Sequence, residues 1–157
     1  RGAAPAPVER RLEDRRVLVA EDGIDNQRLI KLMLTKMGAR VQVASDGSEA
    51  VDLAMNAKHD GQPYDIVLMD MQMPNVDGYE ATATLRDRGY TGPSIALTAH
   101  AMTGDRDRCL AAGCDDFATK PIDRDKLTRT ITAHLDERPT VPGQAVSIES
   151  LGVKAAG

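Results

Sequence analysis

The sequence predicts one α/β domain whose core is a doubly wound parallel sheet of five strands with five helices. The run 66–69 holds four consecutive apolar residues without polar alternation, which is typical of a strand covered on both faces. Apolar runs and helical patterns alternate strictly between residues 16 and 136, which favours parallel strands joined by helical crossovers. The run also ends in Asp70, at the sheet edge where such folds bind ligands.

Five short apolar segments are predicted to be the strands. The first begins at Val17, where the composition changes abruptly from charged to apolar. Val41 and Val43 alternate with polar neighbours, so the second segment is expected at an edge of the sheet. Residues 89–93 form a glycine- and proline-rich turn before the fourth segment. The predicted strands cover residues 17–20, 41–43, 66–70, 94–97 and 116–119.

A helical apolar pattern follows each strand. Asp25 and Asp123 are of the type preferred at helix N-caps, and Gly38 and Gly113 end the first and fourth helices. The apolar stripes expected to face the sheet are Leu29, Leu32, Met33 and Met37, then Ala50, Val51, Ala54 and Met55, then Tyr79, Ala83 and Leu85, and finally Leu127, Ile131 and Leu135.

The two ends of the chain differ in composition from this domain. Residues 1–15 combine an Ala/Pro stretch with alternating charges and are expected to be linker or disordered, and residues 137–157 are expected to be a linker or tail. The first residue is Arg1 rather than Met, so we expect a piece of a longer protein.

Composition narrows the function classes. The net charge of -4 and the lack of a basic stripe argue against nucleic acid as a partner. No apolar run approaches the roughly 18 to 20 residues needed to cross a bilayer, and a cytoplasmic location is expected. Cys109 and Cys114 do not form a CxxC motif and are interpreted as small buried side chains. His59 and His134 are expected to be exposed.

Functional side chains collect at the predicted strand ends, namely Glu21, Asp22, Asp70, Thr98 and Lys120. Three carboxylates at one sheet edge repel one another, and a hard divalent cation such as Mg²⁺ removes that conflict. A lysine adds a positive charge for a phosphoryl oxygen, and a threonine adds a hydroxyl donor. These are the groups needed to move a phosphoryl group onto a carboxylate nucleophile.

The sequence resembles a response-regulator receiver domain over residues 16–136. The matching segments are Glu21-Asp22, residues 68–78, residues 97–99 and Lys120-Pro121, in order at strand ends. Residues 70–74, 97–102 and 112–116 are similar to receivers fused to hybrid sensor kinases, and a stand-alone single-domain response regulator is the alternative. The resemblance implies a flavodoxin-like strand order 2-1-3-4-5.

The resemblance also implies roles. Asp70 would accept a phosphoryl group from a histidine kinase or a histidine phosphotransfer domain, and Lys120 would pair with the carboxylate or its phosphate. Asp22 and Asp70 would ligate Mg²⁺, for which Mn²⁺ can substitute, with the Gln72 backbone carbonyl and with Glu21 acting through water. The remaining assignments are a conformational switch at Thr98 and Phe117, and tuning of dephosphorylation by Gln72 and His100. A weak dimer is allowed, and no enzymatic activity is expected beyond self-phosphorylation and self-dephosphorylation.

Other interpretations fit the residues less well. Haloacid-dehalogenase-like phosphatases need a second Asp two residues after the nucleophile, where this chain has Gln72, which cannot donate a proton as a general acid. A dinucleotide-binding domain needs a GxGxxG motif after the first strand, and the chain has none there. A degenerate receiver used only for interaction would not need Asp22, Asp70 and Lys120 together, and Glu21-Asp22 taken alone could be helix N-caps.

Overall fold

Five parallel strands form one sheet in the order β2-β1-β3-β4-β5, which confirms the expected topology. The computed structural model describes residues 12–73, 76–99 and 103–136. The strands are β1 (Arg16–Ala20), β2 (Arg40–Ala44), β3 (Ile66–Asp70), β4 (Ser94–Thr98) and β5 (Asp116–Thr119). The helices are α1 (Ile24–Lys36), α2 (Gly47–His59), α3 (Gly78–Asp87), α4 (Thr103–Ala112) and α5 (Arg124–Asp136).

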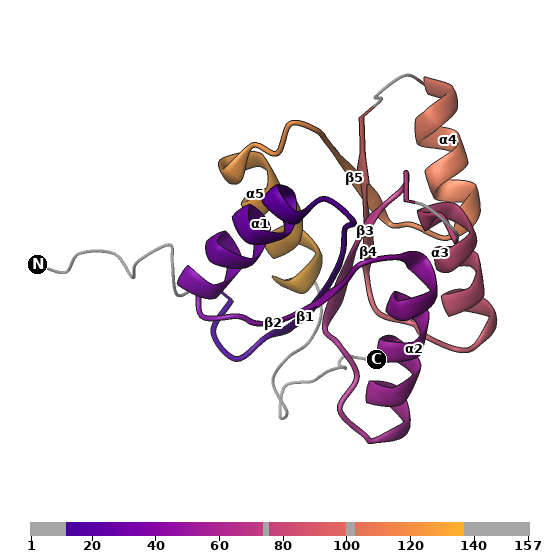
Figure 1. Cartoon of the computed structure of the whole chain (residues 1–157), viewed down its shortest axis with the longest axis horizontal. Helices are drawn as coiled ribbons and strands as arrows, with labels where there is room; N and C mark the ends of the chain where they lie inside the picture. Colours follow the sequence, from indigo (N-terminus) through magenta and orange to yellow (C-terminus); the bar gives the residue numbers. More distant parts are fainter. Residues whose placement is uncertain (1–11, 74–75, 100–102, 137–157) are drawn as a thin grey trace, which may run out of the picture.

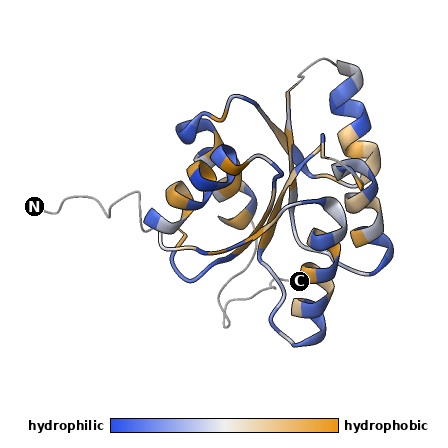
Figure 2. Ribbon diagram, in the orientation of Figure 1, coloured by the Kyte–Doolittle hydropathy of each residue, from blue (hydrophilic) through white to orange (hydrophobic). Residues whose placement is uncertain are grey.

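Helices cover both faces of the sheet (Figure 1): α1 and α5 lie on one side, and α2, α3 and α4 lie on the other. Successive β3 side chains point to opposite faces, so Val67 and Met69 pack with α2 and α3 while Ile66 and Leu68 pack with α1 and α5. The apolar colour of the strands and the polar outer faces of the helices show this layering (Figure 2).

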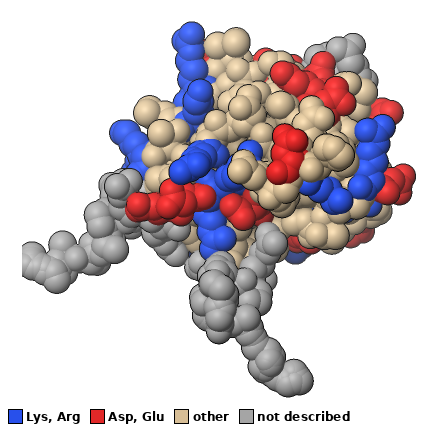
Figure 3. All heavy atoms as spheres, turned by 90° about the horizontal axis from the view of Figure 1, so that it is seen from below, with Lys and Arg blue, Asp and Glu red and all other residues tan. Residues whose placement is uncertain are grey.

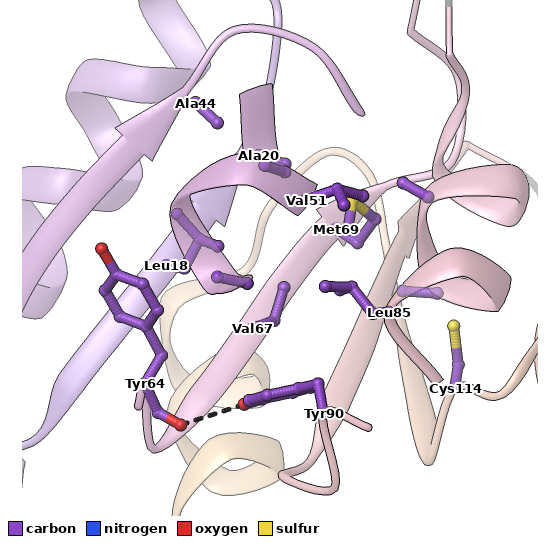
Figure 4. Close-up of a cluster of buried hydrophobic side chains, with 14 of the residues drawn as sticks. Leu18, Ala20, Ala44, Val51, Tyr64, Val67, Met69, Leu85, Tyr90 and Cys114 are labelled. Atoms are coloured by element: carbon purple, nitrogen blue, oxygen red, sulfur yellow. Dashed lines mark hydrogen bonds between the residues drawn. The ribbon is translucent and has the colours of Figure 1, made fainter. Parts of the chain in front are cut away.

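The core on the α2–α4 side also contains a polar contact (Figure 4). The Tyr90 hydroxyl donates to the Tyr64 carbonyl at 3.1 Å, beneath the packed side chains of Leu18, Val67 and Leu85. Both tyrosines lie at the end of the sheet where the strands begin, so this bond closes the core far from Asp70. Its other buried side chains are aliphatic or belong to methionine, apart from the thiols of Cys109 and Cys114, as expected for a sequence with 3% aromatic residues.

The apolar stripe predicted for α1 is partly wrong. Leu29 and Leu32 are 46% and 57% exposed, whereas Ile30 and Leu34 are fully buried against the sheet. The helix carries two overlapping apolar stripes, and the sheet takes the one that the sequence analysis did not choose. The same correction applies to α3, where Ala83 is exposed and the neighbouring Ala81 and Thr82 are buried.

Helix starts follow the expected capping chemistry in three cases. Asp46, Asp77 and Asp123 each accept a hydrogen bond from the backbone N–H three residues further on, at 2.8, 2.9 and 3.1 Å. Helix α1 differs, since its N-cap is Gly23 without a side-chain bond, and Asp25 lies in the first turn. The caps fix the loops that leave the carboxyl ends of the strands.

Residues 12–15 contact the fold although the sequence analysis assigned them to a linker. Leu12 is 1% exposed, and its backbone N–H donates to the Met37 carbonyl at 2.9 Å. Arg15 lies 4.0 Å from Asp65, and Arg40 lies 3.6 Å from Asp14, at the end of the sheet where the strands begin. Positive and negative side chains are mixed on that face (Figure 3).

The two cysteines and the two histidines that the structure describes differ in how they match the expectations from the sequence. Cys109 and Cys114 are buried free thiols, as expected. His134, in contrast, is only partly exposed, and its Nε2 lies 3.0 Å from Asp116 Oδ2. The expectation that His134 points into solvent is therefore wrong, while His59 is exposed. Within residues 12–73, 76–99 and 103–136, no helix is long and apolar enough to cross a membrane.

Candidate functional site

The carboxyl ends of β1, β3 and β5 bring Glu21, Asp70 and Lys120 together. Lys120 Nζ lies 3.0 Å from Asp70 Oδ2 and 3.1 Å from Glu21 Oε1, so one ammonium group bridges two carboxylates. Both carboxylates are 1% exposed, whereas the Lys120 side chain is 21% exposed. The register explains the meeting, because β1 and β5 lie on either side of the β3–β4 pair and all run parallel.

The carboxylate group fits a hard divalent cation. Glu21, Asp22 and Asp70 each offer an oxygen, and these oxygens lie within 4.8 Å of one another. Glu21 Oε1 and Asp70 Oδ2 are buried without a well-aligned hydrogen bond among the described residues, although Lys120 lies beside both. Buried carboxylate oxygens of this kind are suited to a cation with all-oxygen ligands, and the exposed Asp22 leaves the cluster open on one side.

The groups around Asp70 shift the pKa of its carboxyl in opposite directions. Burial raises the pKa of Asp70 above its usual value, and the nearby charge of Glu21 adds to this. The Gln72 backbone N–H, which donates to Asp70 Oδ1 at 3.0 Å, and the Lys120 ammonium both oppose the rise. The pKa of Asp70 is raised on balance, so the ionised carboxylate is held at a cost in stability.

Lys120 is held charged by the same group. Burial by itself lowers the pKa of Lys120, but the close contact with the Asp70 and Glu21 carboxylates and their negative charge outweigh it and raise the pKa above its usual value. Its backbone N–H also donates to the Thr98 carbonyl at 2.8 Å, which fixes the end of β5 against the end of β4. The Lys120 ammonium therefore stays charged at neutral pH, and its backbone is held at the end of β4.

Two glycines hold the chain that follows Asp70, and the sequence analysis gave neither a role of its own. A Cβ on Gly78 would lie 2.2 Å from the Asp70 carbonyl oxygen, and a Cβ on Gly47 would lie 2.3 Å from the Val76 carbonyl oxygen. Side chains cannot occupy such short separations, so only glycine allows α2 and α3 to approach the strand end this closely. The recurring Asp-Gly pairs at helix starts were the available signal.

The two proposed switch residues lie on neighbouring strands. Thr98, at the end of β4, is 2% exposed, and Phe117 on β5 is half-buried against the core on the α2–α4 side. Phe117 is the register partner of Ala96, and Thr98 is the partner of Thr119. The ring of Phe117 also lies beneath the guanidinium of Arg106, 5.3 Å from its centroid, a contact that the sequence analysis did not foresee.

Only one of the two residues expected to tune dephosphorylation lies in the described part of the chain. The Gln72 side chain is exposed and lies two residues beyond Asp70, at the rim of the carboxylate cluster. His100 lies outside the described residues. The structure therefore brings together Glu21, Asp22, Asp70 and Lys120 from the predicted set, with Thr98 at the end of the adjacent strand.

Two histidine kinases are similar in sequence to most of this chain. Hybrid signal transduction histidine kinase I of Dictyostelium discoideum is 44% identical over 124 residues, which cover 76% of this chain and 7% of that protein. The osmosensing histidine protein kinase SLN1 of Saccharomyces cerevisiae is 42% identical over 119 residues, covering 74% of this chain and 10% of that protein. The chain thus spans a tenth or less of the length of these two relatives.

Solved structures of receiver domains have the same fold as this chain. The receiver domain of the sensor histidine kinase PA1611 from Pseudomonas aeruginosa, with a magnesium ion coordinated in its active site cleft, is 40% identical with a TM-score of 0.69, covering 78% of this chain and 98% of that one. The receiver domain of Ssk1 from Saccharomyces cerevisiae, solved with the histidine phosphotransfer protein Ypd1, is 28% identical with a TM-score of 0.69, covering 78% of this chain and 89% of that one. The family model of the response regulator receiver domain matches residues 17–132, and the chain belongs to this family.

Proposed function

We propose that this chain is the phosphoacceptor of a two-component phosphorelay and that Asp70 carries the phosphoryl group. The observation that supports this most strongly is the buried Asp70 carboxylate, contacted at 3.0 Å by Lys120 beside two further carboxylates. A structural ion pair would need one carboxylate for one lysine. Three carboxylates beside one lysine leave an excess of negative charge, which a divalent cation can neutralise, and that cation can then also bind the phosphoryl oxygens.

The reaction transfers a phosphoryl group from a phosphohistidine nitrogen to an Asp70 carboxylate oxygen. The P–N bond breaks as the P–O bond forms, the histidine nitrogen keeps the electron pair of the broken bond, and an acyl phosphate results. Lys120 stays protonated and faces the developing charge on the phosphoryl oxygens, and the Gln72 N–H keeps the Asp70 carboxylate oriented. Asp22, Asp70, the Gln72 carbonyl and Glu21 through water would hold Mg²⁺, which neutralises the phosphoryl oxygens when bound.

The phosphodonor is proposed to be a histidine kinase or a histidine phosphotransfer domain that docks on α1. This helix begins three residues after Glu21, and its outer face exposes three large apolar side chains, Ile24, Leu29 and Leu32, at 46% to 58%. Leu29 and Leu32 line a hollow of about 100 Å³ together with Ile122, two residues beyond Lys120. Exposed apolar residues grouped beside a reactive carboxylate are suited to a helical partner.

Intact-protein mass spectrometry tests the phosphoacceptor role. The parent chain is incubated with acetyl phosphate, with and without Mg²⁺, and should gain the mass of one phosphate only when the metal is present. Asp70→Asn keeps the shape of the side chain but removes the nucleophile, and should gain none. Phosphate added equally to the parent and to the variant would contradict the proposal.

A matched pair of variants tests the docking proposal. Leu32→Asp places a charge in the apolar patch on α1, whereas Ala83→Asp places one on an exposed position of α3 on the other face of the sheet. Transfer from a phosphorylated histidine phosphotransfer protein should slow with Leu32→Asp alone, while labelling by acetyl phosphate stays unchanged in both. Equal transfer rates in the two variants would remove α1 as the docking surface.

A further inference from the structure

Helix α4 is the least deeply packed helix around the proposed switch. Among residues 104–112, Cys109 alone is buried, and the other side chains are exposed or half-buried. The end of this helix is fixed, since Arg86 Nε donates to the Gly113 carbonyl at 2.9 Å while its other nitrogens contact the Tyr90 and Gly92 carbonyls and the Asp115 carboxylate. The position of the rest of α4 depends on few contacts.

Besides the buried Cys109, two arginines of α4 contact neighbouring elements. The Arg106 guanidinium lies 5.3 Å from the ring centroid of Phe117 on β5, and the Arg108 guanidinium lies 3.9 Å from the ring centroid of Tyr79 on α3. The two arginines therefore reach the two elements on either side of the helix. Guanidinium groups at such distances from an aromatic face are attracted by its negative charge density.

The contact of Arg106 involves the ring that is proposed to move. Phe117 lies next to Ala96 on β4, two residues before Thr98, and its ring is half-buried rather than fully enclosed. The parallel register puts the side chains of Ala96, Thr98 and Phe117 on the same face of the sheet. If Thr98 turns toward a phosphoryl group on Asp70, the space it leaves is on the face that this ring occupies. A ring that moves inward leaves the guanidinium of Arg106, so the two arrangements exclude each other.

We propose that Arg106 is a positioning residue that holds Phe117 in its outward arrangement and so sets how strongly phosphorylation must act to switch the domain. This inference rests on the proposed function of Asp70 and goes beyond it, because it adds an opposing interaction from α4. A ligand shifts a two-state equilibrium only through interactions that differ between the states, and the Arg106 contact exists in one of them. Removing it should favour the inward ring by about two- to fivefold, the factor that a cation–π contact at an exposed site represents.

The chain contains one phenylalanine, which makes the ring directly observable. Protein labelled with ring-¹³C phenylalanine gives signals from Phe117 alone, and these are recorded with and without Mg²⁺ and beryllofluoride, a mimic of the phosphoryl group. In the metal-free state, the signal of Arg106→Ala should lie part of the way toward the position that the parent reaches with the mimic. Arg106→Lys keeps the charge and should lie between the parent and Arg106→Ala. Arg106 is exposed, so both variants should fold.

Arg108→Ala is the matched control. It removes the same charge from the same helix but a different aromatic contact, and the metal-free Phe117 signal should stay at the parent position. The labelling rate with acetyl phosphate should rise about two- to fivefold in Arg106→Ala and remain unchanged in Arg108→Ala.

Three results would contradict the proposals, and they distinguish the role of Asp70 from that of Arg106. A parent signal that does not respond to the mimic, in protein that also resists phosphorylation, would overturn the proposed function of Asp70. A parent signal that responds while Arg106→Ala coincides with the parent would overturn the role of Arg106 alone. Equal shifts in Arg106→Ala and Arg108→Ala would also overturn it, because general loosening of α4 would then explain the effect.

Discussion

Replacing Gly78 with alanine should destabilise the protein and impair phosphorylation together. The new Cβ would lie 2.2 Å from the Asp70 carbonyl oxygen and 2.7 Å from the Met71 Cα, whereas ordinary contacts begin at 3.4 Å. Both obstacles are backbone, so either β3 or the start of α3 must move. Overpacking of this kind costs about 1 to 3 kcal/mol, and here the displaced segment carries the Asp70 carboxylate.

Gly104 provides the matched control for this prediction. It also lies in the first turn of a helix, but a Cβ there would have no heavy atom within 4 Å. Gly104→Ala should therefore leave phosphorylation unchanged and stabilise the protein by up to about 1 kcal/mol, because alanine loses less backbone freedom on folding.

Urea unfolding followed by circular dichroism measures both changes, and acetyl phosphate labelling of the folded variants measures the second effect. A Gly78→Ala protein with the stability and the labelling rate of the parent would refute the reasoning, since it would mean that the close approach of α3 to the Asp70 carbonyl is not needed. Loss of stability with unchanged labelling would show that the strain is absorbed in α3 without moving Asp70.

Three further predictions concern charge and burial. Asp22→Ala should lose most of the Mg²⁺ affinity measured by titration calorimetry and most of the labelling by acetyl phosphate, because one of three carboxylates is removed. In metal-free protein at pH 7, Asp70→Asn should raise the free energy of unfolding measured in urea by on the order of 1 kcal/mol. The reason is that burial raises the pKa of Asp70, so folding disfavours its ionised form. The difference between the two proteins should therefore shrink as the pH falls through that raised pKa. Burial also raises the pKa of the Cys114 thiol to about 11, so iodoacetamide at pH 8 should modify Cys114 only after unfolding.

Periodicity and strand ends were enough to predict a parallel sheet with crossover helices and to place Asp70 and Lys120 at one edge of it, whereas the strand order and the pairing of these two side chains were expected from the resemblance to receiver domains. In a parallel sheet the carboxyl ends of all strands share one edge, and the observed order places β1 beside β3 with β5 one strand beyond β3, within reach of a long lysine side chain. The Asp123 cap was predicted because capping is a local property of the chain, whereas the prediction for Asp25 was wrong, since α1 begins one residue before it, after Gly23.

Packing choices between similar residues could not be predicted. On α1, Leu29 and Leu32 form as good an apolar stripe as Ile30 and Leu34, and only the orientation of the helix on the sheet decides which pair is buried. The exposed pair is informative for that reason, since it leaves an apolar surface next to the candidate site.

Contacts between residues far apart in the sequence were missed for a different reason. Arg86 joins α3 to Gly113, Arg106 covers Phe117, and His134 pairs with Asp116, yet each looked like an ordinary surface charge in the sequence. Long polar side chains have no periodicity that reveals their partners, so these contacts depend on the tertiary structure. The function of the Asp-Gly pairs was likewise visible only once the approach distances were known.

The central claim is that the phosphoryl group is carried by Asp70, and chemical reduction of the phosphorylated protein tests it most directly. Borohydride reduces an acyl phosphate to an alcohol and leaves free carboxylates unchanged, so the labelled residue becomes homoserine and is located by tandem mass spectrometry of peptides. The account predicts homoserine at position 70 alone, and only in protein treated with acetyl phosphate and Mg²⁺. Homoserine at Asp22 or Glu21 instead, or a phosphate that survives reduction, would contradict it.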